Sequence, residues 1–148
     1  MTAPSGKALR DAGLRPTRQR LSVLESLRGR PDAVTAQDLH AELRAAGEGI
    51  GLTTVYRTLT ALAEAGLLDV FARDGEQAFR RCGDVHHHHL VCETCNRVEE
   101  LSAGEVEDWV HQAADRHGFE VTGHRADIFG ICASCRTATG PESDPASR

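Results

Sequence analysis

The chain has 148 residues, of which 40% are hydrophobic and 26% charged, and a formal net charge of −5, which is the composition of an ordinary soluble protein with one domain or two small ones. No apolar run approaches the roughly 18 residues that cross a bilayer, and the N-terminus has no apolar segment of the kind that directs export. We therefore expect a cytoplasmic protein without a membrane partner, in which the five cysteines are metal ligands or reactive thiols rather than disulfides.

Charge is distributed unevenly along the chain. Residues 1–82 contain 12 Lys/Arg and 10 Asp/Glu, whereas residues 83–148 contain 5 and 12. The second part also holds seven of the eight histidines and four of the five cysteines. This asymmetry suggests two modules with different partners, although a net charge of +2 is too small to indicate DNA binding by itself.

Three short helices are predicted in the first part, because apolar residues recur there at helical spacing between start and stop signals. The three segments span residues 15–31, 35–49 and 52–68. Thr17 and Thr35 are expected to begin the first two helices, and Thr53 or Thr54 to cap the third. A glycine is expected to end each helix.

A β-hairpin is predicted directly after the third helix. Residues 67–81 alternate in hydrophobicity on both sides of Asp74-Gly75, a dipeptide typical of hairpin turns. Three helices followed by a hairpin describe a winged helix-turn-helix. Tyr56, Arg57 and Thr60 project away from the apolar stripe of the third helix and would enter a DNA major groove. A winged helix that docks on another protein is the alternative.

Two cysteine pairs in the second part predict a structural zinc site. The four residues form two Cys-x-x-Cys motifs: Cys92, Cys95, Cys132 and Cys135. Each motif can place two thiolates on one ion, and two motifs complete a tetrahedral shell of four sulfurs. Redox-active cysteine pairs are the alternative, but they need a thioredoxin-like setting that is not evident here.

The 36 residues between the two motifs leave room for a strand, a helix and a returning segment. We expect the strand at residues 97–101, the helix within 102–118 and an extended return over 119–132. Ser102 and Glu105 have the spacing of a helix capping box.

Four consecutive histidines precede the first cysteine motif in a segment that is predicted to be a strand. Because side chains alternate along a strand, His86 and His88 would share one face, and His87 and His89 the other. The run could then supply two pairs of ligands to two metal sites. The available partners are Asp69, Cys82, Glu107 and His124, and their spacing does not decide which of them joins which pair. A solvated polar run is the alternative.

The segments GLTTVYRTLTALAEAGLL, HHHHLVCETC and GICASC, together with the hairpin, resemble the ferric uptake regulator family over roughly residues 8–136. The closest resemblance is to its zinc-sensing branch, the zinc uptake regulators. It implies an α+β fold with a winged-helix DNA-binding domain and hinge at 1–82 and a small α/β dimerisation domain at 83–137. Residues 138–148 are expected to be a disordered tail because of their composition.

The resemblance also implies a function and a set of site residues. Members of the family are homodimeric repressors, not enzymes, that bind AT-rich inverted repeats in double-stranded DNA when loaded with metal and repress metal uptake genes. The implied metal ligands are Cys92, Cys95, Cys132 and Cys135 for a structural zinc site, Asp69, Cys82, His87 and His89 for a sensory site at the hinge, and His86, His88, Glu107 and His124 for a further regulatory site. The implied or candidate DNA contacts are Tyr56, Arg57, Thr53, Thr54, Thr60 and Arg15.

Ligand chemistry favours zinc as the metal that is sensed. A site that combines the Cys82 thiolate with two imidazoles suits Zn²⁺, whereas an iron sensor would favour oxygen and nitrogen ligands. We expect two to three Zn²⁺ per subunit, and sensors of iron, manganese, nickel or peroxide on the same scaffold are the alternatives. A zinc hydrolase is a remote alternative, because a catalytic zinc needs an open coordination position and each predicted site has four protein ligands.

Overall fold

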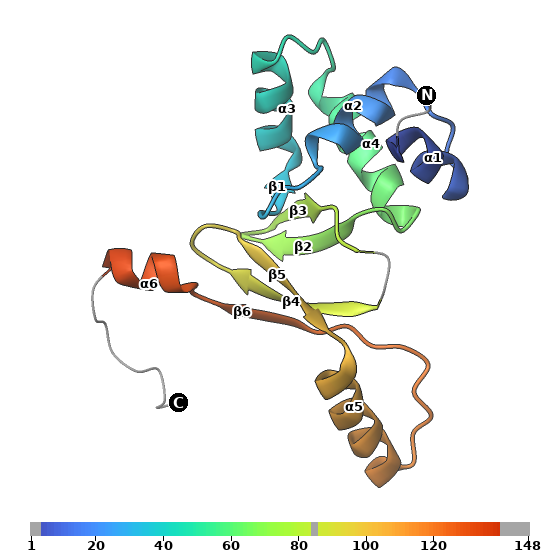
Figure 1. The fold of residues 1–148 in the computed structure, drawn as a ribbon, viewed down its shortest axis with the longest axis vertical. Helices are drawn as coiled ribbons and strands as arrows, with labels where there is room; N and C mark the ends of the chain where they lie inside the picture. The colour runs from blue at the N-terminus through green and yellow to red at the C-terminus, as the bar shows by residue number, and fades with distance from the viewer. Residues whose placement is uncertain (1–3, 84–85, 140–148) are drawn as a thin grey trace. The chain divides into compact units, whose positions relative to one another are not determined.

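The computed structural model describes residues 4–83 and 86–139 (Figure 1). The chain divides into two compact units, Met1–Asp84 and Val85–Arg148, and each is described below by itself. As expected, the described residues form an α+β fold. None of the helices in these two ranges is long and apolar enough to cross a membrane.

The described residues of the N-terminal unit form four helices. They are α1 (Pro4–Asp11), α2 (Arg18–Ser26), α3 (Ala36–Ala45) and α4 (Leu52–Glu64). The last three correspond to the predicted helices, whereas α1 was not expected because its eight residues contain too little apolar periodicity. One side of α1 is nevertheless buried, since Leu9 and Ser5 have no exposed surface, and the Ser5 hydroxyl donates a hydrogen bond to Glu25.

Threonine side chains begin two of these helices as predicted. Oγ1 of Thr17 accepts a hydrogen bond from the backbone N–H of Arg20 at 3.3 Å, and Oγ1 of Thr35 accepts one from Asp38 at 3.2 Å. The predicted threonine cap of α4 is wrong. Gly51 is the N-cap of α4 and makes no side-chain hydrogen bond, because the helix begins two residues too early for Thr53 to occupy that position.

A three-stranded antiparallel sheet completes the N-terminal unit. Its strands are β1 (Val34–Thr35), β2 (Asp69–Arg73) and β3 (Glu76–Arg80), in the order β1-β3-β2. Asp74 and Gly75 both have positive φ, at 47° and 80°, which is the backbone of the tight hairpin turn predicted at this dipeptide. The two-residue strand β1 was not expected, since so short a segment has no visible alternation.

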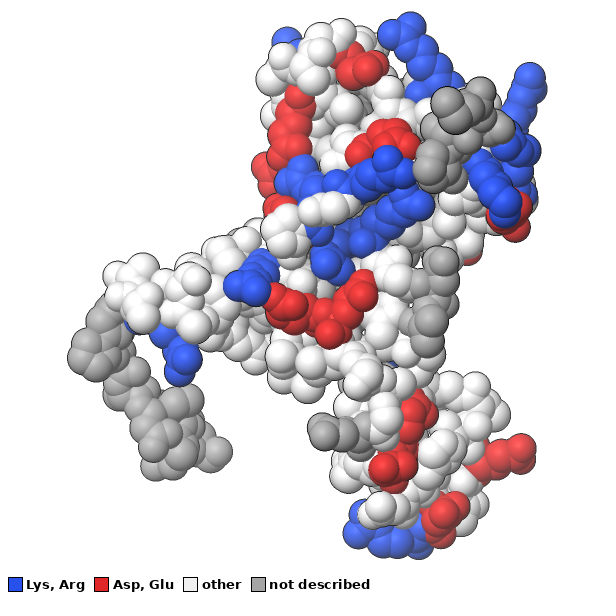
Figure 2. All heavy atoms as spheres, viewed as in Figure 1, with Lys and Arg blue, Asp and Glu red and all other residues white. Residues whose placement is uncertain are grey.

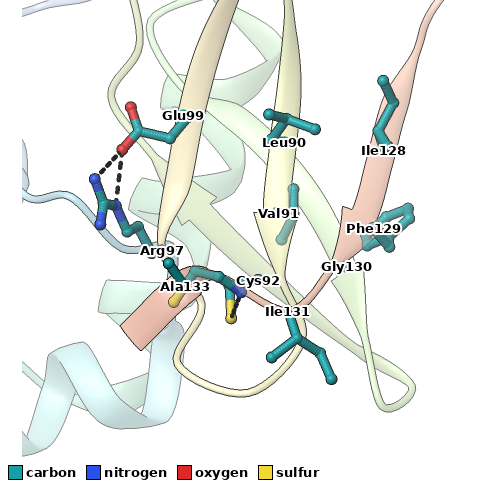
Figure 3. A pocket seen from close by; sticks show the side chains of 11 residues that line it. Leu90, Val91, Cys92, Arg97, Glu99, Ile128, Phe129, Gly130, Ile131 and Ala133 are labelled. Atoms are coloured by element: carbon teal, nitrogen blue, oxygen red, sulfur yellow. Dashed lines mark hydrogen bonds and ion pairs between the residues drawn. The ribbon is translucent and has the colours of Figure 1, made fainter. Parts of the chain in front are cut away.

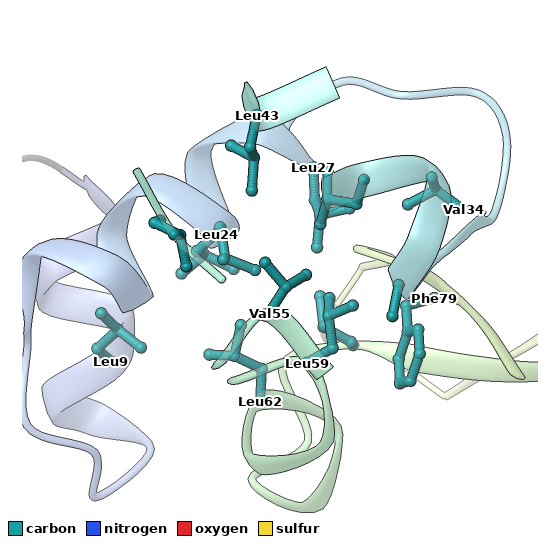
Figure 4. Packing of buried hydrophobic residues seen from close by; sticks show 14 residues of the cluster. Leu9, Leu24, Leu27, Val34, Leu43, Val55, Leu59, Leu62 and Phe79 are labelled. Atoms are coloured by element: carbon teal, nitrogen blue, oxygen red, sulfur yellow. The ribbon is translucent and has the colours of Figure 1, made fainter. Parts of the chain in front are cut away.

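The core of the N-terminal unit joins the helices to the sheet (Figure 4). Leu24 on α2, Leu39 on α3 and Leu59 on α4 have no exposed surface, and Phe79 on β3 packs against the same cluster. Full burial of such a side chain stabilises the fold by roughly 1.5–3 kcal/mol. This packing fixes which face of α4 remains at the surface.

The described part of the C-terminal unit consists of a second three-stranded sheet and two helices, which can be followed in Figure 1. The elements are β4 (His87–Cys92), β5 (Val98–Ser102), α5 (Gly104–His117), β6 (Asp127–Gly130) and α6 (Ala133–Thr139). Strand β4 lies in the centre, antiparallel to β5 and parallel to β6. Gly118 ends α5 in the left-handed conformation, with φ at 69°, which glycine adopts without steric cost.

Three expectations for this unit need correction. The N-cap of α5 is Ala103 and makes no side-chain hydrogen bond, so Ser102 does not cap the helix. The returning strand covers only four residues, because 119–126 have no regular structure. The expected tail at 138–148 begins inside a helix, since α6 continues to Thr139, and residues 140–148 lie outside the described ranges.

Candidate metal centres

The two cysteine motifs meet at one end of the C-terminal sheet. Cys92 ends β4 and pairs with Gly130 of β6 in the parallel ladder, so the chain that leaves each strand turns at the same edge. Cys132 and Cys135 follow in the loop after β6 and in α6. The four Sγ atoms lie within 4.8 Å of one another, and none of these cysteines is in a disulfide.

The spacing of the four thiols fits a tetrahedral zinc ion. Sγ of Cys95 lies 3.8 Å from Sγ of Cys132, and a tetrahedron with Zn–S bonds of about 2.3 Å has edges of about 3.8 Å. The backbone N–H of Cys132 donates to Sγ of Cys92 at 3.3 Å. Hydrogen bonds from Cys132 and Cys95 lower the pKa of Cys92 to about 6, so this sulfur is held as the thiolate that metal binding requires.

A second cluster lies where α5 meets the start of β4. Nε2 atoms of three histidines surround one carboxylate oxygen, Oε1 of Glu107. Their distances to this oxygen are 2.9 Å for His86, 3.5 Å for His88 and 2.7 Å for His124. His88 is 1% exposed, so this cluster is partly closed to solvent.

The cluster around Glu107 has the features of a cation site. Oε1 of Glu107 and Nε2 of His88 are buried, and among the described residues neither atom has a partner with full hydrogen-bond geometry, although His86 and His124 lie within hydrogen-bond distance of Oε1. Buried polar atoms are rarely left in this way. Burial acts to raise the pKa of Glu107, but the charges of His124 and His86 outweigh it and lower that pKa. Lone pairs that converge on one point without hydrogen bonds suit a bound metal ion.

Two residues of the predicted sensory site belong to the N-terminal unit. Asp69 begins β2 and pairs with Arg80 of β3, and Cys82 follows two residues after Arg80. A guanidinium N–H of Arg80 donates to Sγ of Cys82 at 3.1 Å. Burial raises the pKa of the Cys82 thiol to about 12, and Asp69 acts in the same direction while Arg80 opposes it.

The other two residues of the predicted sensory site, His87 and His89, belong to the C-terminal unit. Their rings project from the same face of β4, with centroids 4.7 Å apart and nearly perpendicular planes. Nδ1 of His89 lies 2.8 Å from Oδ1 of Asp127 on β6. His88 projects from the opposite face of β4, where its ring centroid lies 5.0 Å from that of His86, which precedes the strand.

The predicted DNA contacts on α4 do not all share one surface. Tyr56 is 50% exposed, and Arg57 and Thr53 are exposed as well, with Thr54 half-buried. Thr60 departs from the prediction, because it is half-buried and its hydroxyl oxygen is enclosed without a hydrogen bond. Outside this helix, Arg15 is exposed ahead of α2.

The sequence did not predict two contacts of the proposed ligands, Arg80 with Cys82 and Asp127 with His89. Arg80 and Cys82 are two residues apart, so the alternation of a strand could have placed them on one face. Asp127 and His89 are brought together by the register of β4 and β6, for which no local pattern gives a signal.

The profile of the ferric uptake regulator family matches residues 11–129 of this chain. The chain belongs to the ferric uptake regulator family. A zinc uptake regulation protein of Mycobacterium tuberculosis is 49% identical over 127 residues, which are 85% of this chain and 98% of that protein. The ferric uptake regulation protein of Escherichia coli is 39% identical over 134 residues, 87% of this chain and 90% of that protein.

Solved structures agree with this membership. The Vibrio cholerae ferric uptake regulator superposes with a TM-score of 0.69 at 35% identity, covering 86% of this chain and 98% of that one. A zinc uptake regulator in complex with zinc and DNA gives 0.67 at 30% identity, with coverages of 90% and 91%. This member of the ferric uptake regulator family is therefore a metal-responsive transcription regulator and not an enzyme.

Proposed function

We propose that this chain is a zinc-responsive repressor that binds double-stranded operator DNA as a metal-loaded homodimer and controls zinc uptake and homeostasis genes in the cytoplasm. The main support is the kind of donor atoms available. The donors proposed for the hinge, Asp69, Cys82, His87 and His89, combine a thiolate with two imidazoles and a carboxylate, a set that suits Zn²⁺ better than Fe²⁺. The name of the Mycobacterium tuberculosis relative agrees with this choice.

Zinc would be bound at two to three sites in each subunit. The four cysteines form the structural site, and His86, His88, Glu107 and His124 form the additional regulatory site. Neither site has a vacant position for a substrate once four protein ligands are bound, as is usual for zinc that does not take part in catalysis.

The proposed DNA-binding surface is the exposed face of α4 in the N-terminal unit. Tyr56 and Arg57 would contact base edges and phosphates in the major groove, with Thr53 and Thr54 in the first turn beside them. Arg15 would contact the backbone near the minor groove. Figure 2 shows Lys and Arg side chains (blue) spread over this unit, with Asp and Glu side chains (red) among them. Attraction of DNA phosphates would therefore depend on individual arginines rather than on a uniformly basic surface. The operator would be an AT-rich inverted repeat.

The proposed dimer interface is an apolar face of the C-terminal sheet, within the dimerisation domain at 83–137. Leu90 on β4 pairs with Ile128 on β6, and they are 41% and 46% exposed. Ile131 follows at 51%, and the same residues line a hollow on this surface (Figure 3). An exposed apolar strip of this kind is usually covered by a partner, and a second copy would give the two-fold symmetry of an inverted repeat.

Metal dependence would come from ligands that belong to different units. Asp69 and Cys82 lie in the N-terminal unit, and His87 and His89 lie in the C-terminal unit. If all four bind one ion, its binding selects the arrangement that presents them together. The two α4 helices of a dimer would then be held at the spacing of successive major grooves, and zinc and DNA would favour each other's binding.

Titration of DNA binding with metal tests this proposal. Protein that carries zinc only at the four cysteines is titrated with Zn²⁺, Fe²⁺ or Mn²⁺ in the presence of operator fragments, and affinity is measured by fluorescence anisotropy. Zn²⁺ should restore tight binding at the lowest free concentration. Cys82→Ser and His87→Ala should remove the response, with His111→Ala as the control. Unchanged zinc dependence in the first two variants, or activation by iron at lower concentration, would contradict the proposal.

A further inference from the structure

The hydrogen bond between His89 and Asp127 has the geometry of a support for a metal ligand. Nδ1 of His89 and Oδ1 of Asp127 are 2.8 Å apart, and the two residues are aligned in the parallel ladder of β4 and β6, so both side chains project from the same face of the sheet. His89 is 7% exposed. The contact is therefore shielded from water on the side of His89, whereas Asp127 remains 23% exposed, and the sheet holds both residues in place.

Two carboxylates contact the histidines of the run, and they do so with different geometry. Oε1 of Glu107 is approached by three imidazole nitrogens without hydrogen-bond geometry, which is how a metal ligand lies among other ligands. Oδ1 of Asp127 instead makes a hydrogen bond to a single ring nitrogen. Asp127 thus contacts the ring on the side that would face away from a metal ion.

We propose that Asp127 is a positioning residue that holds the His89 ring in the tautomer and orientation needed to bind the sensed metal through Nε2, an inference that rests on the proposed role of His89 as a ligand. An ionised carboxylate only accepts hydrogen bonds, so Nδ1 of His89 carries the hydrogen and Nε2 carries the lone pair. Histidines that bind metals usually donate their second ring N–H to a carboxylate or carbonyl in this way.

The hydrogen bond between Asp127 and His89 also affects His87. The His87 and His89 rings are 4.7 Å apart and at 88° to each other, so the orientation of one ring restricts the other. An Asp127 that fixes His89 therefore also stabilises the geometry of the pair. Loss of the carboxylate should loosen both rings and weaken the metal site without removing any ligand.

Four variants test this role in protein that carries zinc only at the four cysteines. Asp127→Ala and Asp127→Leu remove the acceptor. Asp127→Asn keeps a carbonyl oxygen that can accept from Nδ1, and is the conservative rescue. Glu99→Gln, which removes a carboxylate from β5 of the same sheet without a histidine contact, is the matched control for loss of charge. Circular dichroism identifies which of the two removal variants is folded.

The first measurement is the tautomer of His89, observed by long-range ¹H–¹⁵N NMR before metal is added at the hinge. Wild type, Asp127→Asn and Glu99→Gln should show the Nδ1–H form, and the removal variants should show a mixture of both forms. The second measurement is a Co²⁺ titration, in which the thiolate-to-cobalt absorption of Cys82 reports only the hinge site because the other four cysteines hold zinc. The removal variants should bind Co²⁺ about 10- to 100-fold more weakly, and Asp127→Asn should bind it close to wild type.

His89→Ala separates the two possible failures. If His89→Ala weakens the Cys82–cobalt absorption and the removal variants do not, the positioning role is wrong while the proposed sensory site stands. If His89→Ala has no effect, His89 is not a ligand, and both the proposed sensory site and the positioning role are wrong. A wild-type tautomer in the removal variants overturns the positioning role by itself.

Discussion

The Sγ atoms of Cys95 and Cys132 lie 3.8 Å apart, although 36 residues separate them along the chain. This distance equals the edge of a tetrahedron of sulfurs around zinc. The parallel pairing of β4 with β6 produces it, because both strands end next to the turns that contain the cysteines. The four-cysteine site therefore joins the two strands and α6, and its metal should contribute to folding.

Removal of zinc from this site should destabilise the C-terminal unit. We expect Cys132→Ser, or a strong chelator, to lower the melting temperature of the unit by more than about 10 °C, because structural zinc contributes many kcal/mol to the folding of a small domain. Calorimetry with zinc analysis measures both quantities. Ser134→Ala, two residues further along the chain in α6 and without a thiol, is the control. A Cys132→Ser protein that melts like wild type would show that the site is not structural.

Glu107 should be needed for metal binding where His111 is not. Glu107→Gln removes the oxygen that His86, His88 and His124 surround, so the protein should bind one zinc fewer per chain in the presence of a moderate chelator. His111→Ala should keep full stoichiometry, because its Nε2 lies 3.9 Å from the other carboxylate oxygen and its ring is exposed. Equal losses in both variants would argue for a different ligand set.

The raised pKa of Cys82 gives a pH dependence with a definite sign. Burial raises the pKa of this thiol from its ordinary value near 9 to about 12. The folded state therefore binds the proton of this thiol more tightly than the unfolded state does. The protonated Cys82 thus contributes to the stability of the fold below pH 9, and this contribution is lost as the pH rises toward 12. Because only the thiolate reacts, alkylation by iodoacetamide at pH 8 should be slow in the folded protein with zinc at the four cysteines.

Comparison with urea-unfolded chain and with Asp69→Asn checks this alkylation result by mass spectrometry. The unfolded chain should react faster at Cys82, and Asp69→Asn should react at an intermediate rate because Asp69 is the second cause of the shift. A folded protein that reacts as fast as the unfolded one would show that Cys82 is not protected.

Arg57 should contribute to operator affinity. Arg57→Ala and Tyr56→Ala should each weaken specific DNA binding by about 1–3 kcal/mol, and leave zinc binding unchanged. Arg28→Ala removes an exposed arginine that pairs with Glu25, and should bind the operator like wild type. Anisotropy measurements at two salt concentrations check this, and an equal loss in all three variants would point to general charge attraction.

Two leucines on α4 should differ sharply in their effect on stability. Leu59 has no exposed surface, whereas Leu52 is 41% exposed. Leu59→Ala should lower the free energy of unfolding of the N-terminal unit by about 2–5 kcal/mol, since it leaves a cavity in the core, and Leu52→Ala should cost less than half as much. Urea unfolding followed by circular dichroism measures both, and similar losses would contradict the packing of Figure 4.

Much of the local structure follows from neighbouring residues. Thr17 and Thr35 accept the hydrogen bonds of the helix N-termini that they precede, and Asp74-Gly75 adopts the positive φ values of a tight turn. The alternation of His87, His88 and His89 along β4 puts His88 on the face opposite to the other two. These features depend on backbone conformation over a few residues, so the sequence alone was sufficient to predict them.

The tertiary structure decided what depends on contacts between distant segments. Helix α1 is held by burial of Leu9 rather than by its own apolar pattern. Thr60 is on the predicted helix, but packing encloses its hydroxyl. The register of β4 against β6 places Asp127 beside His89, and no local spacing encodes a register between strands that are 38 residues apart. The sequence by itself thus determined the types of the proposed metal ligands, whereas only the pairing of the strands placed a carboxylate beside His89.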